Sequence, residues 1–166
     1  MDAVFYMVLQ FAGAVTGVLV ARGALEQYIA HPSVNYVVTL PGLYGEYWAF
    51  AAELVITFIL MSVILWVSNT RSLNHYTGLF AGALIMIFIS VEGPISGMSM
   101  NPARTFGSAF SANLWTSIWI YFIAPPIGML LAAQLYVGLR GSDRVLCAKL
   151  HHENAARCIF RCNYRQ

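Results

Sequence analysis

The residues best suited to chemistry lie together in one polar segment, residues 93–107, between two long apolar runs. Within it, Asn101, Pro102, Ala103 and Arg104 follow one another. Asparagine is a favoured helix cap, and proline suits the first helical position because it lacks the amide that would be unpaired there. Charge and irregular backbone are tolerated at membrane depth only where protein or a water-filled cavity surrounds them. The segment therefore predicts a half-helix that faces a polar passage.

The electrostatics of such a helix start favour neutral solutes. A helix over residues 102–111 would be about 15 Å long, roughly half a bilayer, so its N-terminus would lie near the midplane. The partial positive charge of that N-terminus and the charge of Arg104 would repel cations and protons, while Asn101 and the first amides donate hydrogen bonds. Residues 93–100 are expected to run without helix and to offer carbonyl acceptors. This combination suits water or a small polyol.

Four apolar segments are long enough to cross a bilayer as helices: residues 3–23, 47–68, 73–91 and 114–139. The chain of 166 residues is 59% hydrophobic and only 10% charged, against about 25% charged in a soluble domain. We therefore expect an all-α, multi-pass integral membrane protein with a channel domain over residues 1–141, surrounded by a lipid bilayer. The net charge of +2 is too small to indicate a nucleic-acid partner.

The remaining residues, 142–166, form a basic tail. Arg71 and six cations from Arg140 onward fall on one side of the four expected spans, so the positive-inside rule predicts a cytoplasmic tail. Three cysteines and one histidine match the composition of a structural zinc site, although the spacing is not a standard one. The alternative is an ordinary reduced tail whose arginines contact lipid headgroups. The candidate metal ligands are Cys147, His151, Cys158 and Cys162.

On three motifs the chain resembles the aquaporin (major intrinsic protein) family over residues 1 to about 140. The motifs are the box at residues 101–104, Gln10-Phe11-Ala12-Gly13, and Glu53-Leu54-Val55-Ile56-Thr57. The resemblance implies a passive channel without enzymatic activity, assembled as a homo-tetramer, with no cofactor in the pore. The family fold is an inverted repeat of six tilted helices and two half-helices. This chain would be a partial bundle, a truncated form that lacks the first two spans and the first box.

The resemblance also implies roles for individual residues. Asn101, Pro102 and Ala103 would form the pore box, and Arg104 with the backbone at Met98 would form the selectivity constriction. Ile89 matches the place where water-selective members carry histidine. Glu53 and Gln10 would support the loop.

Isoleucine in place of histidine at position 89 removes a hydrogen-bond donor from the passage. We therefore expect glycerol or another small neutral solute, besides water, as a permeating solute. Two other classes stay open. One is a non-conducting membrane scaffold or metal-responsive protein. The other is an intramembrane enzyme, which is disfavoured because the spans carry one glutamate and no plausible serine–histidine pair. Parallel copies would bring every half-helix in from the same face, so this chain is expected not to conduct by itself.

Overall fold

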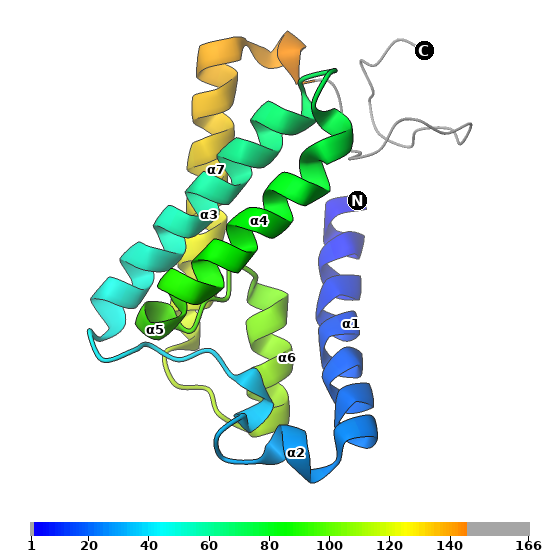
Figure 1. Cartoon of the computed structure of the whole chain (residues 1–166), viewed down its shortest axis with the longest axis vertical. Coiled ribbons are helices and arrows are strands. Elements are labelled where there is room, and N and C mark those ends of the chain that lie inside the picture. Colours follow the sequence, from blue (N-terminus) through cyan, green and yellow to red (C-terminus); the bar gives the residue numbers. More distant parts are fainter. Residues whose placement is uncertain (1, 146–166) are drawn as a thin grey trace.

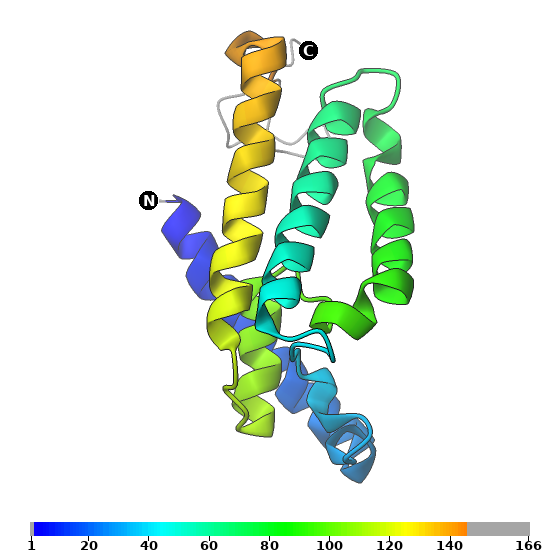
Figure 2. The same cartoon turned by 90° about the vertical axis from the view of Figure 1, so that its left-hand side faces the viewer.

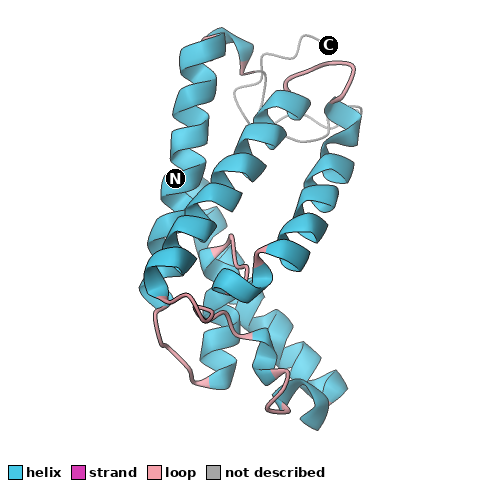
Figure 3. Ribbon diagram, turned by 60° about the vertical axis from the view of Figure 1, so that its left-hand side comes forward, coloured by secondary structure: helices cyan, strands magenta, loops and turns pink. Residues whose placement is uncertain are grey.

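The computed structural model describes residues 2–145. In this range the regular structure is helical and contains no strand (Figure 3). Four helical segments are long and apolar enough to cross a membrane; the third consists of a short turn and the helix that follows it, Asn74–Val91. The prediction of an all-α chain with four spans is therefore confirmed. They are α1 (Asp2–Leu25), α3 (Glu46–Ser68), α4 (Thr77–Val91) and α7 (Ile118–Arg140). The shorter elements are α2 (Gln27–Ala30), η1 (Asn35–Val37), η2 (Asn74–Tyr76), α5 (Gly93–Ser96), α6 (Pro102–Ala112) and η3 (Ser142–Arg144).

Two boundaries differ from the sequence-based expectation. Residues 93–100 are not free of helix, because α5 forms one turn with a proline in its first turn, and Gly97, at φ 79°, ends it. The last span begins at Ile118 rather than at residue 114. Asn113 ends α6 in the left-handed conformation with φ 49°, and the chain needs the following residues to turn.

Helices α3 and α7 form the central pair, and α4 packs on the other side of α3 (Figures 1 and 2). The pair is close because of Gly128. A Cβ atom at Gly128 would lie 2.3 Å from the hydroxyl oxygen of Thr57 and 2.5 Å from the carbonyl oxygen of Leu54. Small residues allow this backbone approach where lipid provides no hydrophobic drive between helices.

Helix α1 packs chiefly against the half-helix α6. Gly107 on α6 permits the contact, since a Cβ there would lie 2.9 Å from the carbonyl oxygen of Ala14. No residue of α1 from Val4 onward is buried, and α4 buries only Thr77 and Phe88. Much of the surface of both helices is therefore left for lipid or for further protein.

The ends of the helices distribute the basic residues asymmetrically. The turn between α3 and α4, which carries Arg71, lies at the same end of the bundle as the C-terminal end of α7, which carries Arg140 (Figure 1). Helix α1 ends at the opposite end, with Arg22 in its last turn. Arg71 and Arg140 thus share one end, as the prediction of the orientation assumed, whereas four of the six tail cations lie outside the described residues.

Candidate functional site: the start of the half-helix

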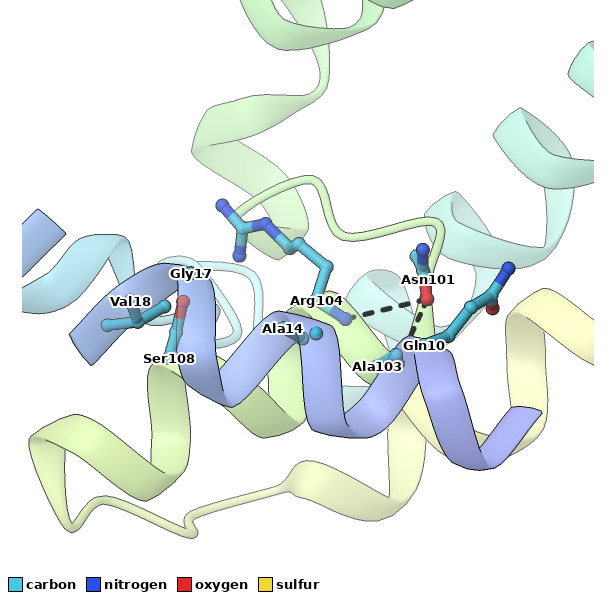
Figure 4. A pocket seen from close by; sticks show the side chains of 9 residues that line it. Gln10, Ala14, Gly17, Val18, Asn101, Ala103, Arg104 and Ser108 are labelled. Atoms are coloured by element: carbon cyan, nitrogen blue, oxygen red, sulfur yellow. Dashed lines mark hydrogen bonds between the residues drawn. The ribbon is translucent and has the colours of Figure 1, made fainter. Parts of the chain in front are cut away.

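Asn101 caps the half-helix α6. Its backbone is extended, with φ −148°, and its side-chain oxygen accepts the amide of Ala103 at 2.9 Å and that of Arg104 at 3.4 Å. The oxygen is thus used within the helix, as in other asparagine caps. The side-chain nitrogen points away from α6, so its two N–H donors are directed outward (Figure 4).

The loop that leads into Asn101 has an unusual backbone. After Gly97, Met98 and Met100 have positive φ values of 47° and 54°. Such values are uncommon for residues other than glycine, and they persist only where the surroundings hold them. The loop therefore needs anchors, and three sets of contacts provide them.

The first anchor is Glu53 on α3, whose side chain is fully buried. One carboxyl oxygen accepts the amide of Ser99 at 2.6 Å and the hydroxyl of Ser96 at 2.7 Å. The other oxygen accepts the amide of Met100 at 2.8 Å. A buried carboxyl group is costly unless hydrogen bonds compensate it, and here three donors converge on it. Glu53 therefore fixes the loop directly before Asn101.

The second anchor is a row of buried hydroxyl groups. The Ser99 hydroxyl donates to the carbonyl oxygen of Asn101 at 2.9 Å and lies 2.5 Å from the hydroxyl of Thr105. Thr105 in turn lies 2.8 Å from the hydroxyl of Thr39, which belongs to the segment between α2 and α3. The row ties the first turn of α6 to two other parts of the chain. The sequence reasoning missed these residues.

The third anchor is Tyr121 on α7, whose hydroxyl donates to the carbonyl oxygen of Ser96 at 2.5 Å. Tyr121 is fully buried. The hydroxyl group of a tyrosine inside a span needs a hydrogen-bond partner. This requirement is the signal that could have linked Tyr121 to the loop. Together the anchors hold the loop between α3, α6 and α7.

Arg104 lies in the first turn of α6 and is half-buried. Its guanidinium group lies on the same side of α6 as the side-chain nitrogen of Asn101 (Figure 4). The Nη1 atom is buried and has no hydrogen-bond partner among the residues that the structure describes. A guanidinium keeps its charge at any ordinary pH, so this position carries a fixed positive charge and unused donors.

Two cavities meet at Asn101 and Arg104. The first, of about 450 Å³, lies against α1 and is drawn in Figure 4. The second, of about 550 Å³, extends toward α4. The first is lined by Gln10, Gly13, Ala14, Gly17, Val18, Asn101, Ala103, Arg104 and Ser108. The second is lined by Val37, Leu60, Ile85, Ile89, Gly93, Gly97, Met98, Ser99, Met100, Asn101, Arg104 and Met129.

The cavities place the remaining predicted residues. Ile89 is exposed and lines the second cavity together with Met98, which is itself buried. Gln10 is exposed on α1 and lines the first cavity, whereas the loop amides of Ser99 and Met100 bond to Glu53. The four candidate zinc ligands of the tail lie outside the described residues. The site is thus a set of directed donors and one cation on the wall of two adjoining cavities.

Comparisons with known proteins identify the family of this chain. A profile of the major intrinsic protein family matches residues 1–136. Aquaporin NIP2-3 of Zea mays is 36% identical over 147 residues, which cover 87% of this chain and 46% of the relative. A probable NIP-type aquaporin of Nicotiana alata is 35% identical over 143 residues, which cover 85% of this chain and 51% of the relative. The chain thus spans about half the length of these curated relatives. Because the family profile matches residues 1–136, which is nearly the whole apolar part of the chain, the chain belongs to the major intrinsic protein family.

Proposed function

We propose that this chain lines one wall of a passive channel for water and small neutral solutes such as glycerol. The observation that carries the proposal is the pairing of Asn101 and Arg104 at the start of an anchored half-helix, where both line two adjoining cavities. Amide and guanidinium donors can replace the hydrogen bonds that water or a hydroxyl group loses on leaving bulk solvent. The chemistry is transport only, and no covalent step is involved.

The charges at this position support selectivity against cations. The N-terminus of α6 contributes a partial positive charge, and Arg104 adds a full one. A cation or proton that passes Asn101 would meet both charges, and the carboxylate of Glu53 is fully buried behind the loop rather than exposed to the passage. At Ile89 the wall of the second cavity is apolar, which favours the carbon backbone of a polyol and is the reason for including glycerol.

The opposite wall of the channel is proposed to come from a second segment, either in a longer form of the protein or in a partner chain. The face of α1 that lines the first cavity supports this. A Cβ atom at Gly13 or at Gly17 would meet no other atom within 4 Å, so this small-residue face is unoccupied. Small residues four apart are a usual surface for close helix packing in membranes. Assembly as a homo-tetramer and a cytoplasmic tail remain parts of the proposal.

Water flux into lipid vesicles tests the proposal. We expect vesicles that hold this chain alone to swell no faster than empty ones. A fusion of this chain to the part of maize aquaporin NIP2-3 that the match does not cover should conduct water and glycerol without conducting protons. Flux through the chain alone would contradict the need for a second wall. A fusion that is inserted and folded but passes neither solute would contradict the channel and favour a non-conducting scaffold.

A further inference from the structure

Glu92 is a buried acid that the proposed channel does not yet use. It follows α4 directly and begins the turn of α5, outside the four candidate spans. Its side chain is 5% exposed, and neither carboxyl oxygen has a hydrogen-bond partner within residues 2–145. An ionised carboxylate without partners is strongly disfavoured in such a place. The neutral, protonated form is the one that the surroundings accommodate.

Burial and the neighbouring carboxylate of Glu53 favour the same form. Burial of the carboxyl group raises the pKa of Glu92 from 4.5 to about 7; the side chain of Ser96 opposes this rise, and the negative charge of Glu53 on α3 adds to it. Tyr121 on α7 is the other titratable group that interacts with Glu92 electrostatically. Arg104 on α6 interacts with Glu53 and with Tyr121. A second negative charge beside Glu53 is therefore unfavourable.

Ser96 connects Glu92 to the anchor of the loop. It lies one turn further along α5, where its amide donates to the carbonyl oxygen of Glu92 at 3.3 Å. Its hydroxyl donates to Glu53 at 2.7 Å and accepts the amide of Met98 at 3.1 Å. A serine hydroxyl has one proton to give. A charged Glu92 would compete with Glu53 for that proton, whereas a protonated Glu92 would leave it in place.

We propose that Glu92 is a positioning residue whose protonated carboxyl keeps the hydrogen bonds between Glu53 and the loop intact. When Glu92 loses its proton, the two carboxylates repel each other and compete for Ser96. The loop before Asn101 then loosens, and permeation falls. This pH-dependent role rests on the proposed channel function, but the state of the loop can be measured without any transport.

The deciding experiment uses the full chain in lipid nanodiscs, as wild type, as Glu92→Gln, and as the control Glu46→Gln at the exposed start of α3. The folded-state pKa of Glu92 lies above its unfolded value. Its stabilising effect is therefore fully present below a pH of about 4.5 and is lost as the pH rises through about 7. We expect the Tm of the wild type and of the control to fall across this window. The Tm of Glu92→Gln, which keeps a neutral group of the same shape, should stay nearly level.

Infrared spectroscopy supplies a measurement that does not depend on the variant's folding. The wild-type chain should show a protonated carboxyl band that declines from about 90% to about 10% of its intensity between pH about 6 and about 8. Glu92→Gln should lack this titrating band. A wild-type chain with no such band, or equal pH dependence of Tm in wild type and Glu92→Gln, would overturn the inference.

Flux separates this inference from the channel proposal. In the fusion with the maize relative, water permeability of the wild type should fall several-fold between pH about 6 and about 8, the range in which folded Glu92 loses its proton. Water permeability of the Glu92→Gln fusion should not fall. A conducting fusion whose pH profile is unchanged by Glu92→Gln overturns the role of Glu92 and leaves the channel standing. A loss of the pH dependence of Tm in Glu92→Gln, with no flux in any fusion, supports the loop contact and contradicts the channel.

Discussion

A carboxyl oxygen of Glu53 accepts the backbone amide of Ser99 at 2.6 Å, across 46 positions of the sequence. This contact joins the N-terminal half of a membrane-spanning helix, α3, to the loop that leads to the proposed pore residues. It explains how methionines with positive φ values can precede Asn101 without a glycine at each position. The orientation of the half-helix thus depends on a side chain that does not line either cavity.

Replacing Glu53 with glutamine should therefore destabilise the fold. Glutamine keeps one acceptor but turns N–H donors toward loop groups that also donate, so at least one buried donor loses its partner. We expect a loss of about 2–4 kcal/mol in the free energy of unfolding, measured by denaturant titration in detergent micelles. Glu46→Gln, an exposed change on the same helix that keeps an acceptor oxygen for the Ser117 hydroxyl, should cost less than about 0.5 kcal/mol. Equal stability of the two variants would contradict the anchoring role of Glu53.

The close contact of α3 and α7 depends on Gly128. Gly128→Ala would place a methyl group 2.3 Å from the hydroxyl oxygen of Thr57, which forces the helices apart. We expect a loss of at least about 1–3 kcal/mol, the usual cost of overpacking. Gly138→Ala is the matched control on the same helix, because its Cβ would meet no atom within 4 Å. It should be neutral or stabilising, since alanine favours helix. The account of this packing fails if Gly138→Ala is the more damaging of the two.

Two variants of Asn101 separate its structural role from its proposed role in transport. Asn101→Asp keeps an oxygen to cap α6, so stability should change by less than about 0.5 kcal/mol. It removes the two outward N–H donors and adds a negative charge, so water flux through the fusion should fall by about tenfold or more. Asn101→Ala should lose about 1 kcal/mol of stability along with the flux. Undiminished flux in a well-folded Asn101→Asp would show that these donors do not contact the permeating solute.

Much of the fold could be predicted from the sequence, because long uncharged apolar runs have few alternatives to spanning helices. The Asn-Pro pair indicated where α6 begins, and the family resemblance pointed to Glu53. The hydroxyl row could not be predicted. Thr39 and Thr105 are separated by 66 positions, and neither residue type signals a particular partner. The left-handed backbone of Met98 was also beyond prediction, because methionine does not indicate positive φ.

The central claim is that the start of α6 faces the permeation path, and charge reversal at Arg104 tests it most directly. The measurement is the initial rate of osmotic shrinkage, by stopped-flow light scattering, of vesicles that hold equal amounts of folded fusion protein. Arg104→Glu should abolish water flux, because a carboxylate replaces the donors and the fixed positive charge at the junction of the two cavities. Arg71→Glu, the same change in the exposed turn between α3 and α4, should retain the wild-type rate. Wild-type flux in a correctly folded Arg104→Glu would contradict the account.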